Sequence, residues 1–454
     1  MVSVKFRAAL PTSIWTKPPF NNFSFRIFAA MNILLLGSGG REHAIAWKII
    51  QSALCSKLYV APGNAGTQGI AINLDFGDSD FDAIKSACIE YAIEMVVVGP
   101  ETPLVKGIVD YFLDDNLLRQ IPIIGPNKVA AQLEGSKDFS KKIMDDCHIP
   151  TAKYATFTNV NFEAGIEYLK THSVPIVLKA DGLAAGKGVL ICATIEEAIL
   201  EFTAMLQDHK FGDAGAKVVI EEFLQGIELS VFVVTDGTSY KLLPSAKDYK
   251  RIGVGDTGLN TGGMGAVSPV PFADATFLKK VENRVVGPLL HGLNQQGITY
   301  KGFLFVGLMN MNGEPYVIEF NCRLGDPETE VIVPRLKTDI VKVFQAVANT
   351  TVNELNIEIA EETAVTVFLV SGGYPEDYVK GKVITGFDQI QGSHLFHAGT
   401  TMHNQDVVTN GGRVLAITSL ANTIDDAATL SKAAAEKIQY EGKYFRNDIG
   451  NDLI

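Results

Sequence analysis

The sequence predicts an α/β protein that begins with a parallel sheet and continues through two further units. Three observations support this fold class. From residue 31 onward, apolar strand-like runs alternate with helix-like patterns, which is typical of βαβ units. A chain of 454 residues is long enough for about three domains of ~150 residues each. Its 47% hydrophobic and 20% charged residues match an ordinary globular protein.

Net charge is spread unevenly along this chain. The whole sequence carries −12 at pH 7, yet residues 1–30 hold four lysines and arginines and no acidic residue. Residues 31–454 therefore carry −16, because taking a +4 segment from −12 leaves −16. This acidic balance argues against a nucleic-acid partner bound through a broadly basic face, although it permits a local basic pocket for phosphates.

Residues 1–30 are expected to form an extension outside the fold. The segment is basic and free of acids, as transit peptides are, but it lacks a clean amphipathic period. It is either upstream sequence read through or a transit-like peptide, since Met31 opens a strand-like run. The fold prediction therefore starts at Met31.

The apolar runs and the cysteines indicate in which cellular compartment the protein is expected. No apolar run approaches ~20 residues, so we expect no membrane-spanning helix and no membrane partner. The five cysteines are scattered without a C-x-x-C pair, which disfavours a zinc or redox motif and favours a reducing compartment. We expect a cytoplasmic monomer, or an organellar protein if residues 1–30 are a transit peptide.

The first unit, 31–132, follows a βαβ pattern with a helix-like stretch at 43–55. Its strand-like runs lie at 33–36, 58–60, 95–98 and 121–124. Glycine-rich turns follow three of these runs, at 37–43, 61–67 and 99–103. Because parallel strands end at one sheet edge, where such sheets bind ligands, we expect these turns to share a site.

The first turn only partly matches a dinucleotide fingerprint. Glu42 occupies the third glycine position of G-x-G-x-x-G, and the second strand ends at Val60 without an acidic residue, which disfavours a nicotinamide oxidoreductase. The backbone N–H groups of Gly39, Gly40 and Arg41 still favour an anion at the start of a helix. The turn is interpreted as a phosphate site, with a plain βα turn as the alternative.

The second unit, 133–356, opens with a helical pattern that carries Lys137. Strand-like runs follow at 175–179, 188–192, 217–221, 228–235, 303–309 and 315–320. The glycine-rich stretch 245–268 is expected to be a long polar loop, which inside a compact domain is usually functional or disordered. The third unit, 357–454, has a strand-like run at 364–370 and a helical pattern at 424–439.

The glycine-rich segment 179–189 lies between two strand-like runs. It lacks the spacing of a P-loop and the helix that follows one. It is interpreted as a flap that approaches a polyphosphate through Gly186 and Lys187, with Lys179 supplying charge from the preceding strand. A hairpin without function is the alternative.

Two further segments carry candidate ligands. In 218–229, a strand end could pair with an adenine edge and place Glu228 at a ribose hydroxyl, although an ordinary strand end is equally compatible. In 316–323, Glu319, Asn321 and Arg323 alternate onto one strand face, which suits Mg²⁺ carrying phosphates. A structural salt bridge between Glu319 and Arg323 is the alternative.

Taken in order, these motifs resemble the ATP-grasp superfamily, and within it the phosphoribosylamine–glycine ligase (glycinamide ribonucleotide synthetase) family. The motifs that carry the resemblance are LGSGGREHA (36–44), PGNAG (62–66), GPETPL (99–104), EGSK (134–137), KADGLAAGKG (179–188), DYKR (248–251), NTGGMG (260–265) and EFNCRLGDPE (319–328). The resemblance implies a Rossmann-like N-terminal domain, an ATP-grasp core with a flap at 150–224, and a small C-terminal α+β domain.

The resemblance also implies an activity: ATP, glycine and phosphoribosylamine give glycinamide ribonucleotide, ADP and phosphate, in de novo purine synthesis. It implies Mg²⁺ or Mn²⁺ on Glu319 and Asn321, and Arg323 at the transferring phosphoryl group. The implied ATP residues are Lys137, Lys179, Gly186 and Lys187 at the phosphates, Glu221, Glu222 and Leu224 at adenine, and Glu228 at ribose. The implied phosphoribosylamine side is Gly39, Gly40, Arg41, Asn64 and Glu101, faced by Asp326 and Glu328.

At two positions the expected roles do not come directly from the family resemblance. Many ATP-grasp enzymes have a second carboxylate twelve residues before the Glu319 position, where this chain has Gly307, so two protein-held metal ions are in doubt. Asp248 is our own candidate partner for the glycine ammonium, because it starts the glycine-rich stretch. Another ATP-grasp ligase or carboxylase, or a nucleotide-binding protein without catalysis, are the competing interpretations.

Overall fold

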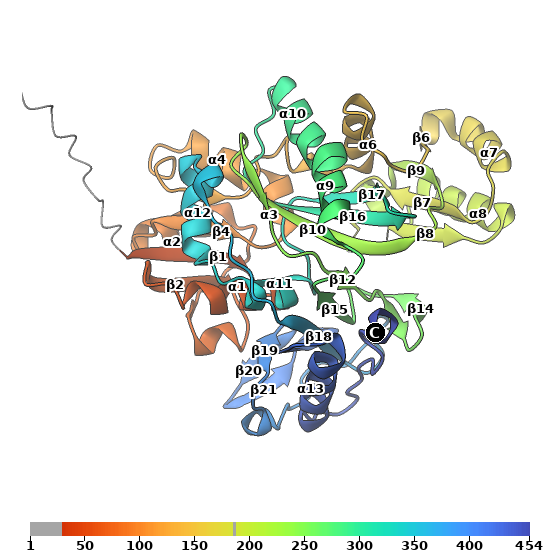
Figure 1. Cartoon of the computed structure of the whole chain (residues 1–454). Coiled ribbons are helices and arrows are strands. Elements are labelled where there is room, and N and C mark those ends of the chain that lie inside the picture. Colours follow the sequence, from red (N-terminus) through yellow and green to blue (C-terminus); the bar gives the residue numbers. More distant parts are fainter. Residues whose placement is uncertain (1–29, 185–187) are drawn as a thin grey trace, which may run out of the picture.

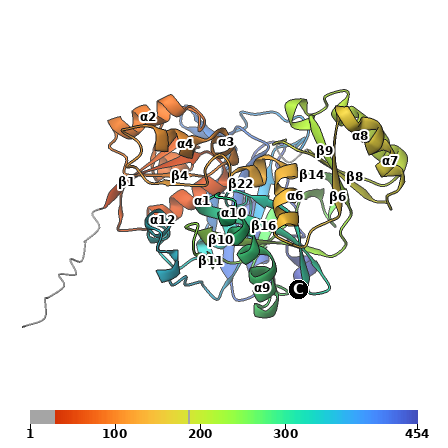
Figure 2. The same ribbon diagram turned by 90° about the horizontal axis from the view of Figure 1, so that it is seen from above.

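A computed structural model describes residues 30–184 and 188–454 (Figure 1). The predictions for the extension up to residue 29, and for Gly186 and Lys187 in the flap, fall outside the described residues. The described chain is a mixed α/β structure, which confirms the predicted fold class. The N-terminal sheet and the flap lie at opposite ends in both ribbon views (Figures 1 and 2).

The N-terminal unit contains a five-stranded, wholly parallel sheet in the order β3-β2-β1-β4-β5. Its strands are β1 (Met31–Gly37), β2 (Cys55–Pro62), β3 (Ile72–Asn73), β4 (Met95–Val98) and β5 (Ile123–Ile124). Its helices are α1 (Gly40–Ile49), α2 (Phe81–Glu90), α3 (Glu101–Lys106) and α4 (Ile108–Asp114). This sheet orients the three predicted turns toward a common edge.

The first helix is shorter than the predicted 43–55. It ends at Ile49 because Ser52 forms a local turn: its hydroxyl accepts from the N–H of Leu54 at 3.1 Å and donates to Asp339 at 2.8 Å. Such side-chain bonds compete with helical ones. Cys55 then begins β2, opposite Met31.

The middle of the chain forms two antiparallel sheets. The flap sheet has the order β6-β9-β7-β8, and the second sheet has the order β11-β10-β16-β17. The flap strands are β6 (Tyr154–Thr158), β7 (Ile176–Ala180), β8 (Val189–Cys192) and β9 (Lys217–Glu222), with α7 (Phe162–Lys170) and α8 (Ile195–Leu206). The second sheet comprises β10 (Ile227–Thr235), β11 (Tyr240–Leu242), β16 (Gly302–Met311) and β17 (Glu314–Asn321), near α5 (Gln132–Gly135), α6 (Lys137–Asp146), α9 (Ala275–Val281) and α10 (Gly287–Gln295).

The C-terminal sheet draws strands from both sides of the boundary predicted at 356/357. Its order is β12-β15-β18-β22-β19. The strands are β12 (Lys247–Asp248), β15 (Gly265–Ser268), β18 (Thr363–Val370), β19 (His394–His397) and β22 (Arg413–Ala421), and α13 (Ile424–Lys437) packs on them. A separate pair, β20 (Thr400–His403) and β21 (Asp406–Thr409), forms a hairpin.

The expected long polar loop at 245–268 is wrong. This stretch contains β12, the hairpin of β13 (Arg251–Gly253) and β14 (Thr257–Asn260), and β15. Each strand has only two to four residues, so no alternating pattern marks it, and β15 pairs with β18 about a hundred residues later. Positive φ at Gly255, Asp256 and Gly258 forms the tight hairpin turn.

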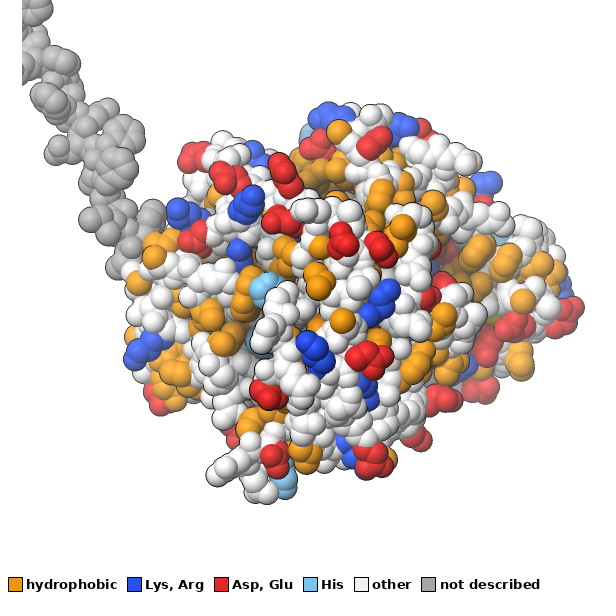
Figure 3. Space-filling view, turned by 60° about the horizontal axis from the view of Figure 1, so that its bottom comes forward, with side chains coloured by type: hydrophobic (Ala, Val, Ile, Leu, Met, Phe, Trp, Pro, Cys, Tyr) orange, Lys and Arg blue, Asp and Glu red, His pale blue; other side chains and the backbone are white. Residues whose placement is uncertain are grey.

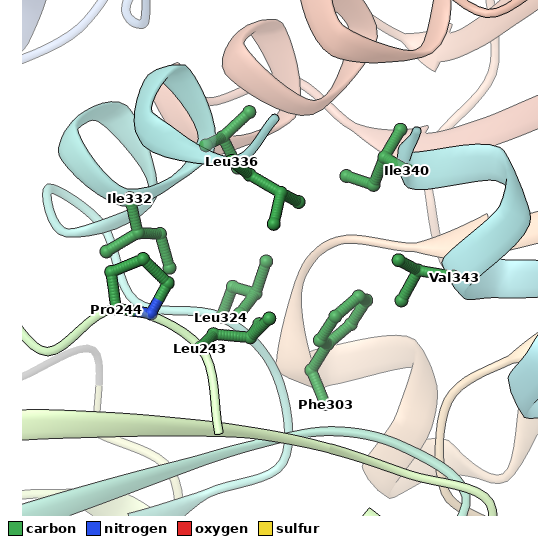
Figure 4. A pocket seen from close by; sticks show the side chains of 9 residues that line it. Leu243, Pro244, Phe303, Leu324, Ile332, Leu336, Ile340 and Val343 are labelled. Carbon is green, nitrogen blue, oxygen red and sulfur yellow. The ribbon is translucent and has the colours of Figure 1, made fainter. Parts of the chain in front are cut away.

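Two helices after β17, α11 (Thr329–Arg335) and α12 (Ile340–Asn349), connect the units. An apolar cavity lies beneath them (Figure 4), lined by Leu243, Pro244, Phe303, Leu324, Ile332, Val333, Leu336, Ile340 and Val343. Because all of these side chains are apolar, the cavity is part of the packing between the N-terminal sheet and the core. On the face shown in Figure 3, acidic and basic side chains are interspersed. Within the described ranges, no helix is both long and apolar enough to cross a membrane.

Candidate active site

Lys179, at the end of β7, lies in a buried ion-pair network. Its ammonium is 3.0 Å from Glu221 Oε2 and donates to the carbonyl of Ile318 at 3.0 Å. Glu221 is 3% exposed and also meets Lys141, whose Nζ lies 3.2 Å from Oε1. Desolvation lowers the pKa of Lys141 to about 8, although Glu221 opposes the shift. Lys179 is thereby fixed across the flap and β17.

The predicted metal ligands Glu319 and Asn321 lie together on β17. The amide of Asn321 is 3.4 Å from Glu319 Oε1. Burial raises the pKa of Glu319, but the positive charges of Lys250, Lys137 and Lys179 outweigh it and lower that pKa overall. An ionised carboxylate surrounded by three ammonium groups suits a site that binds polyphosphate together with a cation.

Gly307 is the partner of Glu319 in the β16–β17 pairing. A Cβ at Gly307 would lie 3.3 Å from Glu319 Cγ and 3.1 Å from Phe305 Cε1. The absence of a side chain therefore leaves room for Glu319. No group of three or more His, Cys, Asp or Glu that could hold a metal occurs in the part of the chain that the structure describes.

Arg323, two residues after β17, bridges two carboxylates. Its Nη2 lies 2.7 Å from Glu134 Oε1, and its Nε lies 3.3 Å from Glu101 Oε2. Glu134 is 4% exposed and also accepts the N–H of Cys322 at 2.8 Å. Burial raises the pKa of Glu101, but Arg323 and Arg41 outweigh it and lower that pKa to about 2. The predicted alternative, a salt bridge from Arg323 to Glu319, is not among the ion pairs of the described residues.

The predicted phosphate turn is closed by carboxylates. The N–H of Gly39 donates to Glu42 Oε2 at 2.7 Å, and the N–H of Arg41 lies 3.4 Å from Asp326 Oδ2. The Arg41 guanidinium contacts Glu42 at 2.6 Å and donates to the carbonyl of Leu324 at 3.1 Å. An anion that binds here must therefore displace or rearrange these carboxylates.

Asn64 connects the first two turns to the C-terminal sheet. Its Nδ2 donates to the carbonyls of Ser38 at 2.8 Å and His397 at 2.7 Å, and its Oδ1 accepts from the N–H groups of Gly66 and Thr67. The polar atoms of this side chain are thus bonded within the chain, which gives Asn64 the role of holding the turns in place.

Asp326 lies between the turn and the C-terminal sheet. Its Oδ1 is 2.9 Å from Arg413 Nη2, and the same guanidinium donates to the carbonyl of Gly262 at 2.7 Å. Glu330, fully buried beside Gly40, has no hydrogen-bond partner among the described residues, and desolvation raises its pKa well above the usual value.

A second charge cluster surrounds Lys250. Its ammonium pairs with Glu228, and Asp248, Glu228 and Glu319 together outweigh burial and raise its pKa. Desolvation raises the pKa of Asp248 to about 6 and that of Glu328 to about 7. Glu328 accepts from the hydroxyl of Ser230 at 3.0 Å. The residues predicted to bind ribose (Glu228), glycine (Asp248) and phosphoribosylamine (Glu328) therefore lie close enough to influence one another's charge.

The predicted adenine residues lie at the end of β9. Glu222 accepts the N–H of Lys153 at 2.9 Å, and Leu224 is half-buried in the segment that leads to β10. Sequence reasoning assigned no role to Lys141, Lys250, Glu134, Glu330 or Arg413. The motifs that contain Glu134 and Lys250 were visible, but only the folded contacts reveal their partners.

This arrangement, a parallel N-terminal sheet followed by two antiparallel sheets of which one forms the flap, is the ATP-grasp fold. The synthetase N5-carboxyaminoimidazole ribonucleotide synthetase, solved as an ADP complex, shares it with a TM-score of 0.63 at 18% identity, over 90% of this chain and 97% of that one. The family models for phosphoribosylglycinamide synthetase match here in three parts: the N domain at 31–134, the ATP-grasp (A) domain at 135–329 and the C domain at 364–452.

Closer relatives narrow the class to one family. Phosphoribosylamine–glycine ligase of Yersinia pestis is 46% identical over 430 residues, which is 93% of this chain and 99% of the relative. The crystal structure of phosphoribosylamine–glycine ligase from Thermotoga maritima superimposes with a TM-score of 0.81 at 37% identity, over 92% of this chain and all of that one. The chain belongs to the phosphoribosylglycinamide synthetase family, which confirms the resemblance inferred from its motifs.

Proposed function

We propose that this protein is a carboxylate–amine ligase of de novo purine biosynthesis, which joins glycine to phosphoribosylamine and converts ATP to ADP and phosphate. One structural observation carries the proposal beyond family membership: Lys179 donates to the carbonyl of Ile318, next to Glu319, and the charges of Lys137, Lys179 and Lys250 lower the pKa of Glu319. Four such charges at one strand end suit a polyphosphate with its cation.

ATP is proposed to bind between the flap and β17. Lys137 and Lys179 hold its phosphates, the segment with Glu221, Glu222 and Leu224 borders adenine, and Glu228 accepts a ribose hydroxyl. The buried pairing of Lys179 with Glu221 supports this assignment, because it fixes the ammonium where the two sheets face each other. The flap glycines around Gly186 and Lys187 are proposed to cover the phosphates.

The oxygens of Glu319 and Asn321 are proposed to hold Mg²⁺ or Mn²⁺. One carboxylate and one amide oxygen fit a cation that completes its shell with phosphate oxygens and water. When bound, the ion neutralises charge on the transferring phosphoryl group. With Gly307 opposite Glu319, this strand pair offers the cation a single carboxylate.

In the first proposed step, the glycine carboxylate attacks the γ-phosphorus of ATP, the bond to the ADP oxygen breaks, and glycyl phosphate forms. Asp248 is proposed to hold the glycine ammonium, and Arg323 to stabilise the phosphoryl oxygens. Since Glu134 and Glu101 fix the guanidinium, it needs little reorganisation during the reaction. If Asp248→Asn left the glycine KM unchanged, this role for Asp248 would be excluded.

In the second step, the amine of phosphoribosylamine attacks the carbonyl carbon, the bond to phosphate breaks, and the nitrogen releases one proton. The turn of Gly39, Gly40 and Arg41, with Asn64 and Glu101, is proposed to bind this substrate, and Asp326 and Glu328 to face it. Positioning and charge neutralisation suffice for such chemistry without a protein nucleophile.

The deciding experiment measures ADP release with freshly generated phosphoribosylamine. Release that requires both glycine and this amine is the expected result. Release with another carboxylic acid, or no release, would contradict the proposal.

We also propose a division into an N-terminal domain at 31–132, an ATP-grasp domain at 133–356 and a C-terminal domain at 357–454. A cytoplasmic location and a monomeric state complete the proposal. Five free cysteine thiols support a reducing compartment, and gel filtration with light scattering measures the oligomeric state.

A further inference from the structure

The strand β12, which carries Asp248, and the segment after it with Lys250 are held by residues from the far end of the sequence. We infer that the segment 444–452, which we call the C-terminal clasp, positions this strand for the amino-acid substrate. Arg446 and Asp452 are its principal positioning residues. The inference rests on the proposed function, because it concerns the same site.

Arg446 forms the first half of the clasp. It is 1% exposed, and its guanidinium makes a two-point contact with Asp448, Nε to Oδ1 at 2.9 Å and Nη2 to Oδ2 at 2.7 Å. Its Nη1 donates to the carbonyl of Arg251 at 3.0 Å and to Asp256 Oδ1 at 3.2 Å. Arg446 therefore connects the C-terminal segment to β13 and to the turn between β13 and β14.

Further bonds continue along the same hairpin. Asp448 accepts the N–H of Gly255 at 2.8 Å, and the hydroxyl of Tyr444 donates to the carbonyl of Ile252 at 3.0 Å. The carbonyl that Arg446 holds belongs to Arg251, the residue directly after Lys250. A shift of the hairpin would therefore move the Lys250 ammonium.

Asp452 forms the second half, on the other side of Asp248. It pairs with Lys247, and its Oδ1 accepts the hydroxyl of Tyr249 at 2.5 Å. That hydroxyl in turn accepts the N–H of Gly450 at 3.1 Å. The residues on both sides of Asp248 are thus fixed by one side chain.

Burial of Arg446 distinguishes its half of the clasp from a surface salt bridge. The Arg446 guanidinium lies 5.4 Å from the centre of the Tyr249 ring, and Ile449 is fully buried next to Gly265 of β15. A buried arginine that makes a bidentate contact holds its partners in one geometry, because its planar guanidinium group has little conformational freedom. Side chains fixed in this way set the distance between Asp248 and a bound ammonium group.

The test compares Arg446→Met and Asp452→Asn with Arg335→Met in the full chain. Arg335 is also buried, but its partners, Ser268 Oγ and the carbonyls of Ala360 and Glu362, include no residue of the clasp. We expect both clasp variants to raise the glycine KM at least about 10-fold with the ATP KM within about 2-fold, because a small misplacement of a binding group is costly. Arg446→Lys should recover part of the loss.

Arg335→Met controls for lost stability and should lower Tm without a selective change in either KM. Should Arg446→Met not fold, Asp452→Asn decides alone, since its side chain is 50% exposed. An unchanged glycine KM, or equal rises for glycine and ATP, would overturn the inference. Absence of glycine-dependent ADP release in the unmodified chain would instead refute the proposed function.

Discussion

The backbone N–H of His397 donates to Nδ1 of His43 at 2.7 Å, so the first helix is bonded directly to the C-terminal sheet. Because this ring nitrogen accepts a hydrogen bond, it carries no proton, and His43 is neutral. Burial, and next the neighbouring His397, lower the pKa of His43 to about 3, while burial alone lowers that of His397 to about 4.

These histidines predict a loss of stability in mild acid. The unfolded chain binds their protons near the ordinary pKa of 6.5 while the folded chain does not, so the free energy of unfolding falls as the pH drops below 6.5. Between pH 6.5 and 5, each histidine contributes about 2 kcal/mol to this loss. Urea titrations of His43→Gln at both pH values should show a smaller drop than the unmodified chain.

The exposed His403 provides the matched control for this measurement. His403→Gln should keep the full pH dependence. An identical drop in the unmodified chain and in His43→Gln would mean that the buried pair does not cause it.

Arg323→Lys is expected to lower kcat by about 10²-fold, with the KM for ATP and glycine changed only a few-fold. Lysine keeps the charge but cannot reach Glu134 and Glu101 together, so the proposed contact with the phosphoryl oxygens loses its fixed direction. Steady-state kinetics measures the effect. Arg284→Lys, at an exposed pair with Glu314, should behave like the unmodified chain, and a loss that appeared only in KM would contradict the assignment.

Lys179→Met and Lys141→Met form a matched pair, because both ammonium groups contact the buried Glu221. Each substitution leaves that carboxylate with one partner fewer and should cost about 3 kcal/mol of stability. Only Lys179 also lies in the field of Glu319, so only Lys179→Met should lower kcat/KM for ATP, by about 10²-fold. Equal kinetic losses in both variants would assign the effect to folding instead.

The Mg²⁺ requirement of the ligase activity is expected to depend on the carboxylate of Glu319. Chelation with EDTA is expected to abolish ligation, and added Mg²⁺ or Mn²⁺ to restore it. Glu319→Gln should raise the Mg²⁺ concentration for half-maximal activity about 10-fold or more, because it removes the carboxylate proposed to hold the ion. Glu314→Gln, five residues earlier on β17, is the control. An equal Mg²⁺ requirement in the unmodified chain, Glu319→Gln and Glu314→Gln would exclude Glu319 as a metal ligand.

The parallel sheet was predictable because its signal is local. The apolar runs of β1 and β4 are fully buried between helices, so the sequence marks them directly. The strand proposed to hold the metal ion was predictable as a strand for a related reason: Glu319 and Asn321 follow the period of two that places both on one face.

The charge partners were not predictable from local pattern. Arg323 meets Glu134 and Glu101 across roughly two hundred residues, and Arg446 reaches Arg251 over a similar separation. Short strands are also hard to predict, because they depend on distant partners: β15 has only four residues, and it is a strand because it pairs with β18. Glycine content alone therefore suggested a loop where the fold has a hairpin and two sheet strands.

The shared C-terminal sheet has a consequence for the order in which the protein matures on the ribosome. The parallel sheet needs only residues up to 124, so it can fold early in synthesis. The strand with Asp248 pairs with β15, but β15 gains its second neighbour only after β18 has emerged, and Tyr249 gains its bond to Asp452 only after residue 452 has emerged. A nascent chain is thus able to form the sheet proposed to bind phosphoribosylamine while the segment proposed to bind glycine is still unfinished.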